Sequence, residues 1–147
     1  MDIITKLSAF EILFLTIVGE ARSESIDNQA AIGCVIRNRM FANPDRYRSY
    51  KDVCLRPYQF PCWNNEGMKV KLLEIAQILI KGEIIKNPTL RQCMFVSRGI
   101  ETWEINDNTH NSNHYLPKDI YYSPERPLWA NGAKTMIEKG NHIFLHI

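Results

Sequence analysis

Residues 8–24 read SAFEILFLTIVGEARSE and carry the strongest structural signal in the chain. Ser8 is followed three residues later by Glu11, the spacing of a capping box, and this predicts a helix from about Ala9 to Ala21. The segment is apolar on nearly every side, so we expect this helix to lie at the centre of the core. The apolar run is too short to span a bilayer.

Glu20 lies at the mouth of this apolar helix. Poor hydration there disfavours the charged carboxylate and favours the carboxylic acid, which can donate a proton as a glycosidase general acid does. The alternative is a solvated carboxylate at a helix end. Glu24 is the nearest second acid and would share a helical face with Glu20 if the helix continued. If the helix ends near Ala21, Glu24 is free to orient Arg22 or a neighbouring backbone group.

The whole chain has 147 residues, with 45% apolar and 23% charged residues, which is the composition of an ordinary globular domain. We therefore expect a single domain over residues 1–147, of α+β class and mainly helical, with a small β element. After the first helix, turn residues, glycines and prolines mark the expected ends of the remaining helices, strands and loops. These elements are a helix that follows the turn and cap at 25–28 and ends at 43–44, an ordered loop with one or two short strands at 44–66, a helix at 68–80 stopped by Gly82, a surface loop at 105–119, and strands at 93–96, 121–122 and 142–147.

The charge and the cysteine content limit the classes of partner and the cellular compartment that we expect. The formal charge is +2 and no run of Lys or Arg forms a stripe, so nucleic acid is not an expected partner. Lys6 is the only basic residue before the apolar run, so no export signal is visible, and we expect synthesis in the cytoplasm without stable membrane insertion. The four cysteines contain no CxxC pair and suggest a reducing compartment, although a bridge between Cys54 and Cys62 stays open.

Two further groups of residues are candidates for chemistry. Gln59, Phe60 and Trp63 combine an amide with two aromatic rings, a set that suits sugar rings. The alternative is that the aromatic rings anchor a loop to the core. The histidines form two pairs with a spacing of four, at 110 and 114 and at 142 and 146, but neither pair lies in a helical pattern. We therefore expect no metal and no cofactor, and no local motif supports a serine or cysteine nucleophile.

Five segments, taken in order, resemble the SleB-type cell-wall hydrolases, a family named for spore cortex-lytic enzymes and also found in phage and other bacterial proteins. These segments are GEARSE at 19–24, QAAI at 29–32 with VIRNR at 35–39, QFPCW at 59–63, DNT through HY at 107–115, and Trp129 with GNHIF at 140–144. The resemblance covers roughly residues 8–145. Ser23 replaces a usual Gly, Asn108 replaces Pro, Leu145 replaces a common aromatic, and the loop at 43–56 matches poorly.

The resemblance implies a lysozyme-like fold related to lytic transglycosylases. It implies cleavage of the peptidoglycan glycan strand between N-acetylmuramic acid and N-acetylglucosamine, with Glu20 at the position of the catalytic glutamate. It also implies help from the N-acetyl group of the substrate, with Glu20 as base on the C6 hydroxyl to give a 1,6-anhydro product, or on water to give hydrolysis. Gln59 and Tyr115 are the expected hydrogen-bonding residues of the cleft, with Phe60 and Trp63 lining it and Glu24 as a secondary catalytic candidate.

Phage lysis enzymes can consist of a bare catalytic domain of this kind, and a phage enzyme without an export signal would depend on a holin or on carriage in the virion. Two alternatives remain from the sequence. One is a metal-dependent peptidoglycan amidase that uses the histidines. The other is a non-catalytic protein that binds the cell wall or forms part of a virion.

Overall fold

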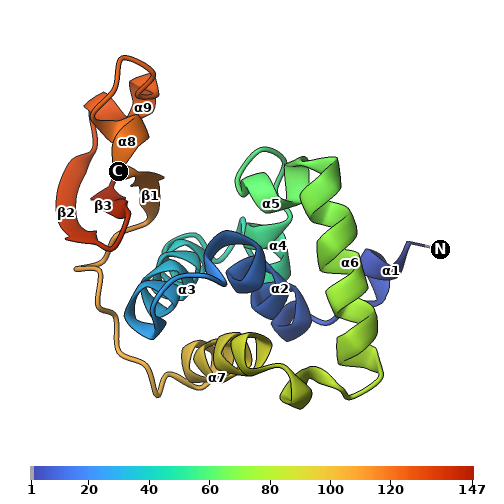
Figure 1. Cartoon of the computed structure of the whole chain (residues 1–147). Coiled ribbons are helices and arrows are strands. Elements are labelled where there is room, and N and C mark those ends of the chain that lie inside the picture. Colours follow the sequence, from blue (N-terminus) through green and yellow to red (C-terminus); the bar gives the residue numbers. More distant parts are fainter. Residues whose placement is uncertain (1) are drawn as a thin grey trace.

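The structure is a computed structural model that describes residues 2–147. A helical part packs beside a small antiparallel sheet that carries two short helices (Figure 1). The helices are α1 (Ile3–Lys6), α2 (Ala9–Ala21), α3 (Ile26–Ala42), α4 (Tyr50–Cys54), α5 (Pro61–Asn64), α6 (Glu66–Ile80), the 3₁₀ turn η1 (Ile84–Lys86), α7 (Pro88–Thr102), α8 (Lys118–Tyr121) and α9 (Leu128–Asn131). The strands are β1 (His114–Pro117), β2 (Lys134–Lys139) and β3 (His142–His146). The mainly helical α+β class predicted from the sequence is confirmed.

Helix α2 lies at the centre of the helical part, as the sequence predicts. The Ser8 hydroxyl accepts the backbone N–H of Glu11, and the Glu11 carboxylate accepts the backbone N–H of Ser8, so the capping box is present. Every residue from Ile12 to Val18 is buried. Each fully buried aliphatic or aromatic side chain contributes roughly 1.5–3 kcal/mol, so this helix anchors the domain.

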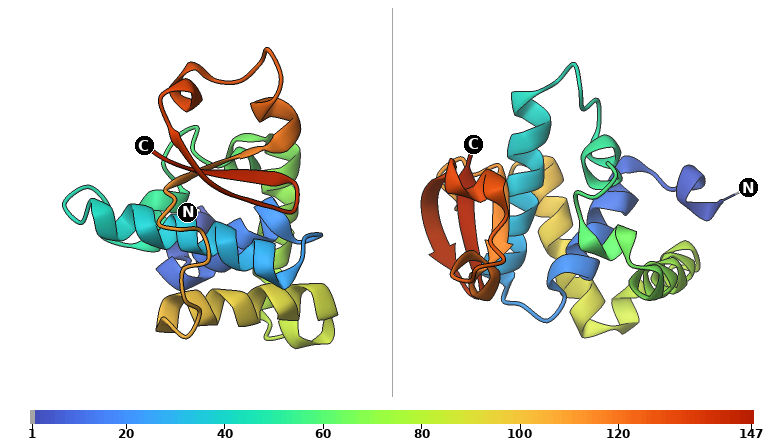
Figure 2. Two further views of the ribbon diagram at one scale, coloured as in Figure 1. Left: turned by 90° about the vertical axis from the view of Figure 1, so that its left-hand side faces the viewer. Right: turned by 90° about the horizontal axis from the view of Figure 1, so that it is seen from above.

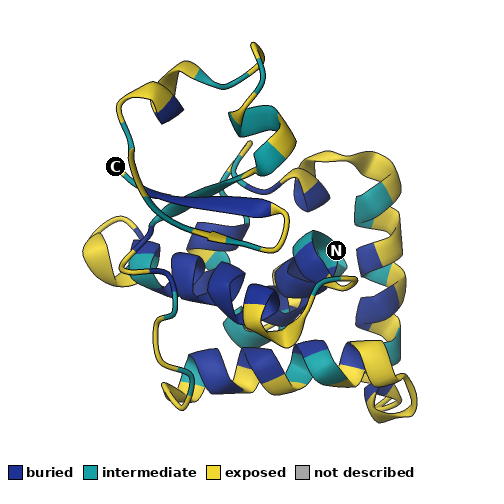
Figure 3. Cartoon of the chain, turned by 60° about the vertical axis from the view of Figure 1, so that its left-hand side comes forward, coloured by how far each residue is buried: buried dark blue, intermediate teal, exposed yellow. Residues whose placement is uncertain are grey.

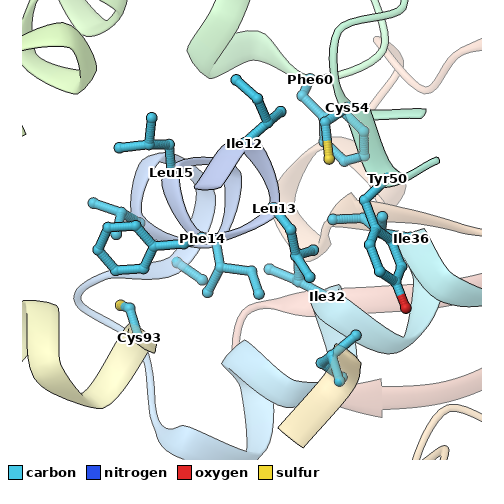
Figure 4. Close-up of a cluster of buried hydrophobic side chains, with 14 of the residues drawn as sticks. Ile12, Leu13, Phe14, Leu15, Ile32, Ile36, Tyr50, Cys54, Phe60 and Cys93 are labelled. Atoms are coloured by element: carbon cyan, nitrogen blue, oxygen red, sulfur yellow. The ribbon is translucent and has the colours of Figure 1, made fainter. Parts of the chain in front are cut away.

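The side chains of α2 point to several sides at once (Figure 4). Ile12, Leu13, Phe14 and Leu15 radiate from the helix toward side chains of the surrounding elements, and all four are inaccessible to solvent. The partners labelled in the same view are Ile32 and Ile36 of α3, Tyr50 and Cys54 of α4, Phe60, and Cys93 of α7. Exposed residues cover the outer faces of the peripheral helices, while α2 remains dark in the burial view (Figure 3). A helix that is apolar all round needs such a complete shell of neighbours.

Four sequence-based assignments of secondary structure are wrong. The surface loop expected at 105–119 contains β1 at 114–117 and the start of α8. The segment at 44–66 contains α4 and α5 and no strand, and the apolar run at 93–96 lies inside α7. Asn87 caps α7 and Pro88 stands in its first turn, and the buried positions Leu90, Cys93 and Ile100 follow a helical repeat. The strand expected at 121–122 is instead the end of α8. A short apolar run does not by itself distinguish a strand from a buried helical face.

The sheet has the order β1-β3-β2, and both pairings are antiparallel. Strand β3, predicted from the sequence, lies in the middle, and its residues from His142 to Leu145 are buried. Strand β1 pairs with β3 so that Tyr115 faces Phe144 in register. Seen from above, the sheet forms a layer beside α3 (Figure 2, right). This layer brings β1 toward the C-terminal end of α2.

Candidate active site

A cleft of about 570 Å³ lies where the end of α2 meets the sheet. Its walls come from segments that are far apart in the sequence. The end of α2 contributes Gly19 and Glu20, the segment before α5 contributes residues 58–61, and β1 contributes residues 114–117. The remaining lining residues are Arg39, Met68, Pro127, Trp129, His142 and Ile147. The cleft is therefore produced by the tertiary fold and not by one continuous motif.

Glu20 lies in the last turn of α2 and is partly buried in the wall of this cleft. The Tyr115 hydroxyl donates a short hydrogen bond to Glu20 Oε1. The backbone N–H of Cys62 donates to Glu20 Oε2 at a nitrogen–oxygen distance of 3.2 Å. Three elements, α2, α5 and β1, thus converge on one carboxylate, and both of its oxygens have a fixed partner.

Tyr115 presents its hydroxyl to Glu20 from strand β1. Burial raises the pKa of Tyr115 well above its ordinary value, and the adjacent Glu20 carboxylate raises it further. The phenol therefore stays protonated at neutral pH. The ring is held by three aromatic neighbours, with centroid distances of 6.5 Å to Phe60, 5.3 Å to His142 and 5.8 Å to Phe144. These contacts fix the position of the hydroxyl.

Arg39, whose role the sequence did not indicate, connects two walls of the cleft. Its Nη1 donates to Gln59 Oε1 at 2.7 Å, and its Nε and Nη2 donate to the Asn113 carbonyl at 3.0 and 2.7 Å. Burial lowers the pKa of Arg39. The sequence signal was its place in the VIRNR segment, but spacing alone does not show that a helical arginine reaches a loop twenty residues away.

His142 closes the inner side of the cleft and belongs to a polar contact between the sheet and α3. Asn28 Nδ2 lies 3.2 Å from His142 Nδ1, and both residues are buried. An amide nitrogen can only donate, so Nδ1 accepts and the neutral ring carries its proton on Nε2. Burial lowers the pKa of His142, although the carboxylates of Glu24 and Glu20 act in the opposite direction. The neutral ring is thus favoured.

The loop that leads into β1 is organised by Asp107. Its carboxylate accepts the backbone N–H groups of Thr109 and Asn111 and the Thr109 hydroxyl, and Asn38 Nδ2 lies 3.3 Å from it. Burial acts to raise the pKa of Asp107, but these hydrogen bonds together lower it. Asn108, which departs from the family pattern, donates to the carbonyl and the carboxylate of Asp27, both at 3.0 Å. The loop is thereby fastened to α3, which positions Tyr115.

The structure brings four of the six candidate residues into the cleft, namely Glu20, Gln59, Phe60 and Tyr115. Trp63 does not line it, because its side chain is buried and its Nε1 donates to Thr16 Oγ1 at 2.9 Å. Trp63 therefore anchors α5 to α2, which was the alternative left open for the aromatic residues. Glu24 does not line the cleft either. Helix α2 ends at Ala21, and the Glu24 carboxylate faces the β2–β3 turn near Gly140.

Gly19 allows the close approach that places Cys62 beside Glu20. A Cβ atom at Gly19 would lie 2.6 Å from Cys62 Cβ and 2.8 Å from its Sγ. We expect Gly19→Ala to destabilise the protein by about 1–3 kcal/mol, since α5 must move away from α2. The same movement lengthens the bond from the Cys62 N–H to Glu20. Urea unfolding measures the first effect and an activity assay measures the second.

Gly132→Ala is the control for Gly19→Ala, because nothing lies within 4 Å of an added Cβ there and φ is −95°. We expect this control to change the free energy of unfolding by less than about 0.5 kcal/mol. Equal effects of the two substitutions would show that crowding against Cys62 is not the cause.

The histidines and cysteines do not gather into a metal site. Within residues 2–147, no three His, Cys, Asp or Glu side chains lie close enough to hold a metal ion. His114 Nδ1 lies 2.9 Å from Asn113 Oδ1, while His146 Nδ1 lies 2.7 Å from the Asn111 carbonyl. Burial lowers the pKa of His114 to about 4. All four cysteines, including Cys54 and Cys62, are buried free thiols.

Two solved structures are similar to this chain along nearly its full length. One is the catalytic domain of the germination-specific lytic transglycosylase SleB from Bacillus anthracis, with 22% identity, a TM-score of 0.58 and 93% of each chain covered. The other is the catalytic domain of the Bacillus cereus SleB protein, with 22% identity, a TM-score of 0.57, and 93% of this chain and 88% of that chain covered. The fold is thus the lysozyme-like fold of these catalytic domains, as expected. No curated protein sequence is similar enough to count as a match.

The sequence profile of the Cell Wall Hydrolase family matches residues 23–145. The chain therefore belongs to the Cell Wall Hydrolase family. The matched range begins at Ser23, after Glu20, so the role of this glutamate depends on the geometry of the cleft. Over residues 2–147, no helix has both the length and the apolar character needed to cross a membrane.

Proposed function

We propose that this protein cleaves the glycan strand of peptidoglycan between N-acetylmuramic acid and N-acetylglucosamine, with Glu20 as the general acid and then the base. The observation that carries the proposal is the Glu20 carboxylate, which lines the cleft and is held by Tyr115 and by the backbone of Cys62. Membership of the Cell Wall Hydrolase family makes the cell wall the place of action and peptidoglycan the substrate class.

The two partners of Glu20 suit both protonation states of the carboxyl group. Protonated Glu20 donates to the glycosidic oxygen as the bond breaks and positive charge develops on the muramic ring. The Tyr115 hydroxyl accepts a hydrogen bond from a carboxylic acid and donates one to a carboxylate, because a phenol can do both. The Cys62 N–H only donates, and Glu20 Oε2 can accept from it both as a carboxylate oxygen and as the carbonyl oxygen of the acid. One fixed side chain can therefore give and later take a proton.

Among residues 2–147, the lining of the cleft includes one acidic side chain and no second. This side chain is Glu20, and Glu24 faces the β2–β3 turn. A retaining glycosidase that forms a covalent intermediate needs two carboxyl groups about 5 Å apart. The arrangement favours assistance by the N-acetyl group of the substrate. Glu20 then activates either the C6 hydroxyl of the muramic residue, which gives a 1,6-anhydro end, or water, which gives a reducing end.

Sugar binding in this proposal uses groups that remain available in the cleft. Gln59 Oε1 is occupied by Arg39, while Gln59 Nε2 has no hydrogen-bond partner among residues 2–147 and can donate to a sugar hydroxyl. Phe60 is only 2% exposed, so it supports the Tyr115 ring more than it offers a stacking surface. Trp129 is 41% exposed at the rim, with its ring 5.0 Å from His114, and offers an apolar face to a sugar ring.

Mass spectrometry of digested peptidoglycan tests the proposal. We expect muropeptides that end in muramic acid, and an anhydro end is lighter than a hydrolysed end by one water. Lysis should persist in the presence of a chelator. Released stem peptides with uncut glycan would instead identify an amidase. Sedimentation with purified walls without any soluble product would identify a binding protein.

Tyr115→Phe tests the contact between the phenol and Glu20. We expect a loss in kcat of roughly 3- to 10-fold with little change in KM, because one hydrogen bond to the reacting carboxyl group is removed while the ring stays. Tyr122→Phe is the matched control, since its exposed hydroxyl donates to Glu138 at 2.6 Å outside the cleft. A Tyr115→Phe enzyme as active as the Tyr122→Phe control would remove the hydroxyl from the mechanism.

A further inference from the structure

A second concavity lies between the α3–α4 connection and α4. Its volume is about 640 Å³, so it is as large as the cleft. Its charged and aromatic lining residues are Arg46, Tyr47, Arg48, Lys51, Asp52 and Arg56, and we call it the basic hollow. It lies in the loop at 43–56, which matches the SleB-type pattern poorly. In Figure 2 the α3–α4 connection, which follows the cyan helix, projects as an outer corner of the molecule in both views.

The positive charges of the basic hollow outnumber its negative charges within the described chain. None of its arginine or lysine side chains forms an ion pair in residues 2–147. The one acid, Asp52, accepts the backbone N–H of Arg48 at 2.8 Å. Lys51 Nζ lies 2.8 Å from the Leu7 carbonyl, and Arg56 Nη1 donates to the Tyr47 hydroxyl at 2.6 Å. Four cations therefore face one acid in a concave site, which attracts anions.

Tyr47 organises the floor of the basic hollow. Its side chain is 6% exposed, and the guanidinium carbons of Arg46 and Arg56 lie 5.6 and 5.9 Å from the centre of its ring. The backbone N–H groups of Arg46 and Tyr47 both donate to the Asn43 carbonyl, which fixes the turn after α3. The guanidinium groups keep N–H donors that no described residue uses. Planar guanidinium groups suit carboxylate and phosphate oxygens.

The basic hollow lies next to the cleft. Arg56 lines the hollow, and Tyr58 and Gln59 line the cleft. The two sites have no lining residue in common, but residues two apart in a chain are at most about 7 Å apart between Cα atoms, so one edge of the hollow lies close to one edge of the cleft. Tyr58, at this boundary, is 89% exposed and has a φ of 64°, which is unusual for a bulky residue. A ligand in the cleft with an anionic branch can therefore reach the hollow.

We propose that the basic hollow binds carboxylates of the peptide stems of peptidoglycan while the glycan strand occupies the cleft. The inference rests on the proposed function. The stems branch from muramic acid and carry free carboxylates, whereas the lactyl carboxyl group of muramic acid has no charge while it forms the amide bond to the stem. A stem is joined covalently to the sugar in the cleft, which raises its effective concentration at an adjacent site. Phosphate groups of other wall polymers share the oxyanion chemistry, so the test has to distinguish them from stem carboxylates.

A sedimentation assay tests the binding step without using activity. The Glu20→Gln protein is mixed with intact walls, with walls freed of phosphate polymers by hydrofluoric acid, and with glycan freed of stems by an amidase. The last material has lost the stem carboxylates and keeps only the lactyl carboxylate attached directly to the muramic ring. The added change is Arg46→Ala with Arg48→Ala, two exposed residues outside the cleft. The control, Lys81→Ala with Lys86→Ala, removes the same charge from exposed positions that line neither site.

We expect the Arg46→Ala/Arg48→Ala change to weaken binding to intact and phosphate-free walls roughly 10- to 100-fold, since charge-assisted hydrogen bonds are lost. Binding to stem-free glycan should not change, and the lysine control should behave as its parent on all three materials. If the Arg46→Ala/Arg48→Ala change weakens binding to intact walls but not to phosphate-free walls, the ligand is phosphate and the proposal is overturned. An equal loss on stem-free glycan, or no loss on intact walls, would also overturn it.

Activity separates this inference from the proposed function. Wild-type protein that releases no glycan fragments from any of the three materials contradicts the proposed function, while the sedimentation result still decides the role of the hollow. Wild-type protein that cuts all three materials supports the proposed function. The arginine variant should then lose kcat/KM roughly tenfold or more on intact walls and none on stem-free glycan. An unchanged kcat/KM on intact walls would exclude a contribution of the hollow to turnover.

Discussion

Glu20→Gln is expected to lose lytic activity by roughly 10²- to 10⁴-fold, the range that a general acid or base contributes. Glutamine keeps the shape of the side chain and an oxygen that can accept from Tyr115 or Cys62, but it has no proton to donate to the glycosidic oxygen. The helix that carries it is fixed by its buried residues from Ile12 to Val18, so the fold should persist. Release of soluble muropeptides measures activity, and circular dichroism with thermal unfolding measures the fold.

Glu24→Gln is the control for Glu20→Gln. The Glu24 carboxylate does not line the cleft, so we expect a change of only a few-fold. A loss as large as that of Glu20→Gln would make Glu24 a catalytic partner that reaches the substrate after a rearrangement. Near-native activity of Glu20→Gln would remove this glutamate from the mechanism.

Arg37→Ala is expected to cost about 3–5 kcal/mol of stability, the largest structural effect that we predict. Arg37 is 1% exposed. Its Nη1 donates to the Ile100 carbonyl at 3.0 Å and its Nη2 to the Ile105 carbonyl at 2.9 Å, and its guanidinium carbon lies 3.9 Å from the Trp103 ring centre. Truncation leaves a cavity and two carbonyls without this donor at the end of α7.

Arg98→Ala is the matched control for Arg37→Ala. Arg98 pairs with Glu101 at 3.3 Å on the surface and lies over the Phe10 ring, so we expect a cost of no more than about 1 kcal/mol. Urea unfolding with linear extrapolation gives both values. A cost below about 1 kcal/mol for Arg37→Ala would show that water replaces the guanidinium without loss. Activity of the folded fraction should fall as well, because Arg37 holds the segment that leads toward β1.

The sequence was most informative where local signals agreed. The bounds predicted for α2 match the structure because Ser8 and Glu11 form the predicted cap and the following residues are apolar on every side. Gly82, predicted to stop a helix, has a φ of 73° just after α6. The wrong predictions concern α4, α5 and the middle of α7. These segments are short or carry brief apolar runs. Their type depends on which neighbour covers them, and periodicity over four residues does not contain that information.

The candidate site also contains residues that the sequence identified and residues that only the structure identified. Glu20, Gln59, Phe60 and Tyr115 could be selected from their residue types and order along the chain. Arg39 was missed because its importance lies in contacts to residues 59 and 113, both remote in sequence. Tertiary packing also changed the assignment of two residues, since Trp63 is in the core and Glu24 faces the β2–β3 turn.

The sequence alone predicted a buried helix with a glutamate in its last turn, since a capped and uniformly apolar segment has to be surrounded by the rest of the chain. The tertiary structure alone decided what surrounds that glutamate. Hydrogen bonds have a short range, so only folding could bring the Tyr115 hydroxyl and the Cys62 N–H to the two oxygens of Glu20.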